Sequence, residues 1–322
     1  MVHPFLVILL SGLLAQSIAP EKPRPLTASS SHLLQVPPFS ATGVIQCDRD
    51  FNTYYHVFNG SYRQASILSF SLSGEKSTLY KLPDDIADEM SFIDFSVSPD
   101  GVLKVLAGDK DYHPIVFGFS GDGRMISQAK LDVPAKIVGE HFSVFLNGTI
   151  LFYGYYGREA AKDLAGKRYL ALFKPSGTLI KQIDKAGLGE MNPGEQATHL
   201  PEGGAAIGAD GNVYVLSSDK VLVVSPSGQI QRRIPFTKPG PEFSSLSVQY
   251  SEGLLAISFA KAEGKKLEFR YLVINASDGE KFGLYEPSEE TGNNNVCFSR
   301  HDGFLFSTVK NDRINFVTAP LR

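Results

Sequence analysis

The sequence predicts an all-β fold, a six-bladed β-propeller in which each blade is a four-stranded antiparallel sheet. Three observations support this: one complete four-stranded unit, two series of turn glycines spaced about one blade apart, and an N-terminal segment able to supply a strand that the last blade lacks. A chain of 322 residues with 43% hydrophobic residues is long enough for such a ring. Because neighbouring blades share one continuous core, we expect a single domain.

The complete unit lies at residues 207–236, IGADGNVYVLSSDKVLVVSPSGQIQRRIPF. Its central runs are β-branched and aromatic on both faces, which is typical of strands packed between two neighbouring sheets. Asp210-Gly211 and Ser227-Gly228 are hairpin turn signals, since glycine takes a positive φ without steric strain. The last run carries two arginines and ends at Pro235, the composition of an exposed edge strand.

Two series of glycines recur roughly 50 residues apart, the period of a blade. The turn between the third and fourth strands is marked by Gly74, Gly123, Gly177, Gly228 and Gly279. The turn between the first and second strands is marked by Gly101, Gly148, Gly211, Gly253 and Gly303. Blade 1 has Asp50-Phe51-Asn52 in place of its first turn glycine, and the last blade lacks a fourth strand.

The missing strand is predicted at the other end of the chain. Residues 33–37, LLQVP, resemble the outer-strand endings of other blades, such as residues 79–83 and 130–134. The N-terminal segment can therefore pair with the final blade and close the ring, which removes an open sheet edge. Five full blades and one composite blade make six.

Three short motifs carry a family resemblance: SPDG at residues 98–101, ADGNVYV at 209–215 and SPSG at 225–228. They resemble the blade consensus of bacterial six-bladed propellers of the NHL and TolB-like type. The resemblance covers nearly the whole mature chain and implies the fold. Because these motifs are turn chemistry, they do not imply an activity.

The first residues are typical of export. Residues 1–19 read as a signal peptide with an apolar core at 5–15 and cleavage after Ser17 or Ala19. The alternative is an uncleaved membrane anchor, although the run is short for a transmembrane helix. We expect residues 20–31 to be a disordered leader, residues 32–322 to form the propeller, and the mature protein to be secreted or periplasmic without a membrane span.

Several function classes are disfavoured. The formal net charge is −3 and no basic stripe is present, so nucleic-acid binding is not expected. The sequence contains no phosphate-binding loop, dinucleotide fingerprint or Gly-x-Ser-x-Gly elbow.

Cys47 and Cys297 fall in the predicted innermost strands of blades 1 and 6, which are neighbours in a closed ring. In an exported protein a disulfide between them is one interpretation. Aligned on their turns, however, the two cysteines are offset by two residues. The other interpretation is therefore that they are two buried free thiols.

A binding face is expected where loop length varies. The insertion at 154–167 in blade 3 and the connection at 185–203 lie on the face opposite the glycine turns, between blades 3 and 4. Here Tyr153, Tyr155 and Arg158 could contact a sugar or a peptide. The alternatives are a tolerated surface insertion and tyrosines that pack among themselves.

The mouth of the central channel is the second expected site. Aligned on the first turn of each blade, the polar residues that approach it are Asp94, Glu140, His141, Glu202, Asn294 and Asn295. Their oxygen and imidazole atoms suit a Ca²⁺ ion, with Glu202, Asn295 and Asp94 as its ligands, or acid–base chemistry. The alternative is a polar, water-filled channel mouth.

Two functions therefore remain. The first is an exported, monomeric binding or scaffold module that presents the blade 3–4 face to a peptide, glycan or protein partner. The second is a Ca²⁺-dependent lactonase or lyase. Six-bladed lactonases of the gluconolactonase type hold a channel Ca²⁺ with Glu, Asn and Asp, although their early Glu-Gly-Pro context is absent here. No cofactor other than Ca²⁺ is expected.

Overall fold

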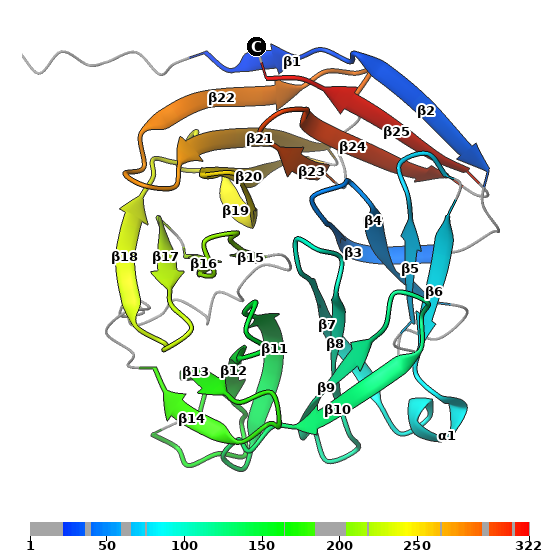
Figure 1. The fold of residues 1–322 in the computed structure, drawn as a ribbon. Helices are drawn as coiled ribbons and strands as arrows, with labels where there is room; N and C mark the ends of the chain where they lie inside the picture. Colours follow the sequence, from blue (N-terminus) through cyan, green and yellow to red (C-terminus); the bar gives the residue numbers. More distant parts are fainter. Residues whose placement is uncertain are drawn as a thin grey trace, which may run out of the picture.

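A computed structural model shows six four-stranded antiparallel units arranged in a ring (Figure 1), which confirms the predicted fold class. The structure describes residues 22–35, 40–58, 66–74, 76–163, 165–183, 204–217, 219–264, 266–291, 296–310 and 313–321. The expected signal peptide lies outside these residues. Among the described residues, no helix is both long and apolar enough to cross a membrane.

The first three blades follow one another along the chain. Blade 1 contains β3 (Ser40–Cys47), β4 (Thr53–Phe58), β5 (Ser66–Phe70) and β6 (Ser77–Lys81). Blade 2 contains β7 (Ser91–Val97), β8 (Leu103–Gly108), β9 (Pro114–Phe119) and β10 (Met125–Lys130). Blade 3 contains β11 (Ile137–Val144), β12 (Ile150–Tyr156), β13 (Arg168–Phe173) and β14 (Leu179–Gln182). One helical turn, α1 (Asp84–Ala87), connects blades 1 and 2.

The second half repeats the pattern. Blade 4 contains β15 (Ala205–Ile207), β16 (Val213–Leu216), β17 (Lys220–Val224) and β18 (Ile230–Pro235). Blade 5 contains β19 (Ser244–Ser251), β20 (Leu254–Glu263), β21 (Lys266–Asn275) and β22 (Lys281–Pro287). Blade 6 contains β23 (Val296–Ser299), β24 (Gly303–Lys310) and β25 (Arg313–Ala319).

The fourth strand of blade 6 is β2 (Ser30–Gln35), which pairs antiparallel with β25, as predicted. The segment before it differs from the expected disordered leader at 20–31. There, β1 (Arg24–Leu26) pairs in parallel with β22 and adds a fifth strand to blade 5. Residues 22–35 therefore cross from blade 5 to blade 6 along the outside of the ring (Figure 1). We call them the N-terminal strap.

The core lies between the blades rather than within any one of them. In β16, Val213 and Val215 pack toward blade 3, while Tyr214 and Leu216 pack toward blade 5. All four are at most 1% exposed. A strand that has a blade packed on each face must be apolar on both faces. This explains why β16 shows no alternation of polar and apolar residues.

The first turn of blade 1 shows what replaces its missing glycine. Phe51 has a φ of 57°, in the left-handed region that Gly101 occupies at 79° in blade 2. Its N–H donates to the carbonyl oxygen of Asp48 at 3.2 Å, as that of Gly101 donates to Ser98 at 2.9 Å. The Phe51 side chain is only 6% exposed. Burial of this ring offsets the strain of a left-handed non-glycine residue.

Cys47 and Cys297 form a disulfide, with 6.0 Å between their Cα atoms. The bond joins β3 of blade 1 to β23 of blade 6 at the inner side of the ring. The offset seen in the sequence arises because the two first turns differ in length. Residues 48–52 separate the paired Cys47 and Thr53, whereas only residues 300–302 separate the paired Ser299 and Gly303.

Candidate functional site

The polar residues predicted at the channel mouth lie near the entry ends of the innermost strands. β7 and β11 each contain an irregularity in pairing, between Phe92 and Asp94 and between Gly139 and His141. Such bulges re-aim the side chains beside them. The Nδ1 atom of His141 lies 3.2 Å from an Oδ atom of Asp94, and both side chains are 12% exposed. Of the predicted channel residues that the structure describes, these two are brought together.

Asp94 also bonds to the backbone of the next blade. The same Oδ atom accepts a hydrogen bond from the N–H of Phe142 at 3.3 Å. The carboxylate therefore links β7 of blade 2 to β11 of blade 3 through two contacts. Asp94 contacts Nδ1 of His141 and not Nε2. A carboxylate that holds one ring nitrogen can orient the imidazole so that the other nitrogen transfers a proton.

Two glutamines make the same kind of link elsewhere in the ring. In blade 1, the amide of Gln46 donates to the carbonyl oxygen of Phe95 at 2.5 Å and accepts from the N–H of Val97 at 2.9 Å. In blade 5, Gln249 donates to the carbonyl oxygen of Val296 in blade 6 at 2.5 Å. Gln46, Asp94 and Gln249 thus each join an innermost strand to the backbone of the next one. We call them inter-blade clamps.

Sequence reasoning missed Gln46 and Gln249. Gln249 lies four residues before its turn glycine, Gly253, whereas Asp94 lies seven before Gly101, and blade 1 has no first-turn glycine with which Gln46 could be aligned. No polar signal distinguishes them in the sequence, since β19 (SSLSVQYS) contains four serines beside Gln249. Because Asp94 makes the same kind of link as the two glutamines, it has a structural role in holding blades 2 and 3 together.

Tyr153 is the cross-strand partner of His141 and is buried rather than on a surface. Its side chain is 2% exposed and packs in the core between blades 3 and 4. Its hydroxyl has no hydrogen bond of ordinary geometry among the described residues, although it lies near Ser143. Burial raises the pKa of this phenol, and the negative charge of Asp94 acts in the same direction.

The other residues predicted around the channel are distributed differently. Glu140 is partly buried in β11 and has interactions of its own. Glu202, Asn294 and Asn295 lie outside the described residues, as does the connection at 185–203. The expected calcium ligand set therefore stays a prediction.

The tyrosines of blade 3 do not share one surface. Tyr153 faces blade 4, whereas Tyr156 packs in the core toward blade 2, with its ring edge-on to Tyr169 at 5.9 Å. Tyr155 is partly exposed. Alternation along β12 places Tyr153 and Tyr155 on one face and Tyr156 on the other. Because Tyr153 is buried, the predicted tyrosines do not form an exposed platform.

The described residues of the blade 3 insertion, 157–163 and 165–167, are held by backbone hydrogen bonds. Tyr156 and Lys167 close it through the Tyr156 N–H and the Lys167 carbonyl oxygen at 2.9 Å, and Gly157 donates to the carbonyl oxygen of Lys136 at 2.8 Å. Lys136 also pairs with Glu159 at 2.5 Å. Arg158, at the start of the loop, is exposed. The loop thus combines a backbone held in place with charged side chains that project into solvent.

The blade 2 loop on the same face contains a group of possible metal ligands, Asp109, Asp111 and His113. The Asp109 carboxylate accepts from the N–H groups of Asp111 and His113, both at 2.9 Å, and pairs with Lys130 at 3.3 Å. Desolvation raises the pKa of Asp109, but the hydrogen bonds to His113, Asp111 and Lys130 lower it more, so the pKa lies below its usual value. They organise a turn, and the other two ligands are exposed.

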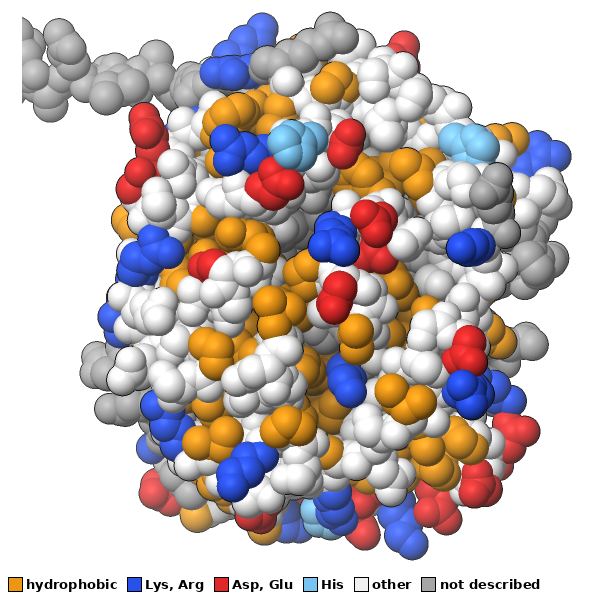
Figure 2. Space-filling model, in the orientation of Figure 1, with side chains coloured by type: hydrophobic (Ala, Val, Ile, Leu, Met, Phe, Trp, Pro, Cys, Tyr) orange, Lys and Arg blue, Asp and Glu red, His pale blue; other side chains and the backbone are white. Residues whose placement is uncertain are grey.

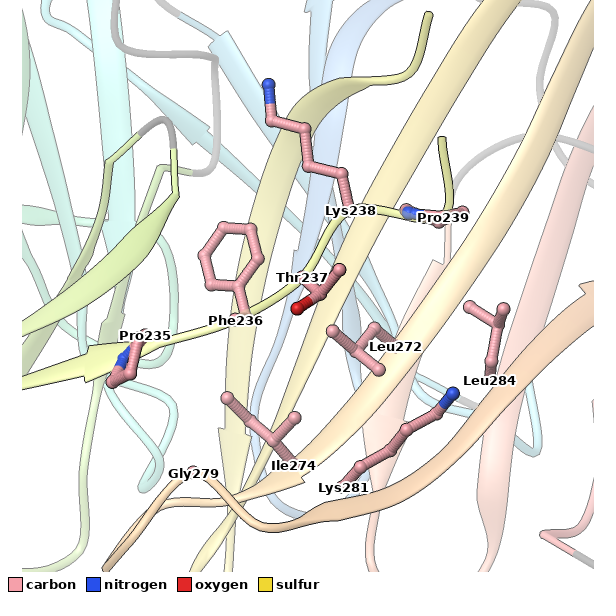
Figure 3. Close-up of a pocket in the computed structure, with 10 residues that line it drawn as sticks. All are labelled: Pro235, Phe236, Thr237, Lys238, Pro239, Leu272, Ile274, Gly279, Lys281 and Leu284. Atoms are coloured by element: carbon pink, nitrogen blue, oxygen red, sulfur yellow. The ribbon is translucent and has the colours of Figure 1, made fainter. Parts of the chain in front are cut away.

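The structure also has a cavity of about 380 Å³ on the outer wall between blades 4 and 5 (Figure 3). Leu272, Ile274 and Leu284 form its apolar side, and Lys238 and Lys281 stand at its rim. It contains none of the predicted site residues. On the face seen in Figure 2, acidic, basic and apolar side chains of the described residues are interspersed, without a broad area of one charge.

Comparison with known proteins gives structural matches but no sequence match. No family model matches the sequence, and no curated protein matches it. Among solved structures, a gluconolactonase from Xanthomonas campestris superposes with a TM-score of 0.53 at 12% identity, over 93% of this chain and 95% of that one. A luciferin-regenerating enzyme gives 0.50 at 10% identity, over 91% and 98%.

This chain has the same six-bladed architecture. A third structure, the PQQ-bound aldose sugar dehydrogenase from Streptomyces coelicolor, superposes with a TM-score of 0.47 at 12% identity, over 91% and 99% of the two chains. At these identities the likeness concerns the fold, because one fold serves many chemistries. The predicted NHL-type assignment within six-bladed propellers stays a prediction.

Proposed function

We propose that the protein is a binding module that presents the loop-bearing face of blades 3 and 4 to a peptide, glycan or protein partner. The observation that carries the proposal is the set of backbone hydrogen bonds that hold the described residues of the blade 3 insertion, 157–163 and 165–167. Five backbone hydrogen bonds involving residues 156–167 hold this segment, and Arg158 is exposed at its start. A rigid loop with solvent-facing charges binds with little loss of conformational entropy.

The role of Asp94 supports the same proposal. Its carboxylate is engaged by His141 and by the backbone of Phe142, as an inter-blade clamp. These contacts link blades 2 and 3 without a metal ion. A module needs these groups only as structural links.

The test is binding to immobilised glycans and peptides, with charge-reversed variants. Arg158→Glu is expected to reduce binding to any recognised ligand by at least tenfold. Lys266→Glu is the matched control, because Lys266 is also exposed and lies where the second strand of blade 5 turns into the third, the position in that blade that corresponds to the blade 3 loop. Equal binding by wild type and Arg158→Glu would exclude this loop as the binding face.

A lactonase is the second candidate, favoured by the Asp94–His141 pair and by the resemblance in fold to a gluconolactonase. In that function His141 would act as a proton acceptor oriented by Asp94, and a bound Ca²⁺ would polarise the lactone carbonyl. About one Ca²⁺ per chain retained after dialysis, with lactone hydrolysis lost in His141→Gln, would replace the binding proposal. If the protein retains no metal and hydrolyses no lactone, the binding module remains the proposed function.

A further inference from the structure

The N-terminal strap is attached mainly through its backbone. In β2, five of the six side chains are exposed, and only Leu34 is partly buried. In β1, Leu26 is 1% exposed and packs in the core between blades 5 and 6. Two leucines, eight residues apart, are therefore the apolar anchors of a 14-residue segment.

The polar contacts of the strap are at the surface. The hydroxyl groups of Ser29 and Ser30 lie 3.1 and 2.5 Å from that of Thr318, and Ser31 donates to Asn315 at 2.8 Å. Exposed hydrogen bonds add little net stability, because water replaces them when they break. The strap is thus among the more weakly held elements of the ring, and such elements open first.

The ring does not depend on the strap alone for closure. The disulfide between Cys47 and Cys297 joins blades 1 and 6 at the innermost strands. β2 reaches blade 6 at the opposite, outermost edge. The strap can consequently leave its place while the disulfide keeps the first and last blades together.

Departure of the strap would uncover two neighbouring sheet edges. Three residue pairs join β1 to β22 in parallel, and six join β2 to β25 antiparallel. Uncovered edges have unpaired backbone donors and acceptors and accept a strand from another chain. The segment that fits both edges, with its leucine anchors in register, is the same segment of a second copy.

Only four residues of the sequence, 36–39 (Val-Pro-Pro-Phe), separate β2 from β3. A stretch of four residues can span at most about 14 Å. A second copy must therefore lie close by to receive the strap.

We propose that the N-terminal strap exchanges between copies, so that residues 22–35 of one chain occupy the edges of β22 and β25 in a second, giving a strand-swapped dimer. The contacts in the dimer are those of the monomer. A short connection gives the chain's own strap an effective concentration in the millimolar range. The chain is therefore mainly monomeric at micromolar concentration, and the swapped dimer forms as the concentration approaches that range.

The experiment mixes two single-cysteine variants of the full chain, Leu33→Cys and Asn315→Cys. These residues are directly paired between β2 and β25, so their β-carbons are close enough for a disulfide. Each variant keeps its native bridge. A heterodimer between them forms only where the strap of one chain lies on the edge of the other. At roughly 0.5 mM protein, mild oxidation is expected to give heterodimer well above the control.

The control pairs Leu33→Cys with Ile126→Cys, which lies 63% exposed on the outer strand of blade 2, so it reports random collision between chains. Heterodimer in the test mixture equal to that in the control would overturn the proposal. A second pair, Ser30→Cys with Thr318→Cys, repeats the test at another point of the same pairing if Asn315→Cys fails to fold. Where both pairs fold, they must agree for the proposal to stand; where Asn315→Cys does not fold, the second pair alone decides.

Discussion

A β-carbon added to Gly177 would lie 2.0 Å from the carbonyl oxygen of Lys130, because the third turn of blade 3 rests directly on the outer strand of blade 2. The same relationship recurs around the ring. The turn glycine of each blade faces the outer strand of the blade before it, in the pairs Gly74 with Leu34, Gly123 with Leu79, Gly228 with Lys181 and Gly279 with Ile234. At Gly123 and Gly177 the nearest atom is a backbone oxygen, so these two glycines are needed for close approach as well as for their positive φ.

This contact predicts a large difference between two glycine substitutions. Gly177→Ala adds a left-handed alanine and a clash with Lys130, whereas Gly211→Ala adds the left-handed alanine alone, since Gly211 has nothing within 4 Å of its added β-carbon. We expect a loss of about 1–2 kcal/mol for Gly211→Ala and more than about 3 kcal/mol for Gly177→Ala. Urea unfolding measures both, and equal losses would contradict the packing role.

Replacing Phe51 by glycine has two opposite effects on stability: it relieves backbone strain and it removes a buried ring. Phe51→Gly removes about 1–2 kcal/mol of left-handed strain but also a buried ring, whose loss is worth about 3–5 kcal/mol. We expect a net destabilisation of about 2 kcal/mol. Tyr112 is the control, because it also has a positive φ, 63°, but is 69% exposed. Tyr112→Gly should stabilise by up to about 1 kcal/mol, and a stabilising Phe51→Gly would show that the ring contributes little.

The Gln46 clamp predicts a stability effect from one amide. Gln46→Met keeps the length of the side chain but leaves the N–H of Val97 and the carbonyl oxygen of Phe95 without this partner. We expect a loss of about 2 kcal/mol in thermal unfolding. Gln128→Met on the exposed strand β10 should change the stability by less than about 0.5 kcal/mol. A matching, small effect at both positions would argue against a clamp.

Buried tyrosines predict a loss of stability in alkali. Burial raises the pKa of Tyr55 and of Tyr169 from 10.0 to about 12, and it also raises the pKa values of Tyr153, Tyr214 and Tyr271. In this range the folded chain keeps protons that the unfolded chain has lost, so stability is fully present below about pH 10 and falls as the pH rises toward 12.

Phenolate absorbance during an alkaline titration checks this, and it is not obscured by indole because the chain contains no tryptophan. The buried tyrosines should ionise together with the loss of circular dichroism from the folded state. Complete ionisation of all 13 tyrosines before unfolding would contradict the prediction.

The ring was predictable because turn chemistry repeats in the sequence. Glycine at Gly74, Gly123 and their equivalents marks a position that only glycine can fill, so its period gives the blade number directly. The strap strand β1 was not predictable, since three residues with one buried side chain, Leu26, form no recognisable pattern. Its pairing depends on β22, which lies more than 250 residues away in the sequence.

The site was less predictable than the fold. Alignment on turns brought Asp94 and His141 together correctly, because blades 2 and 3 have first turns of equal length and bulges at the same point. It could not find the clamp of Gln249, since blade 5 has a shorter first turn, with Ser251 paired directly to Leu254. A shift in one turn moves every side chain of the strand relative to its neighbours.

The disulfide has a consequence for damaged molecules. It joins residues 250 positions apart, so nearly the whole propeller lies within one covalent loop. A protease that cuts once in any loop between residues 47 and 297 therefore releases no fragment. Both parts stay attached through the sulfur atoms, and the other blades still pack against them. The nicked protein would migrate as an intact chain until a reductant separates the pieces.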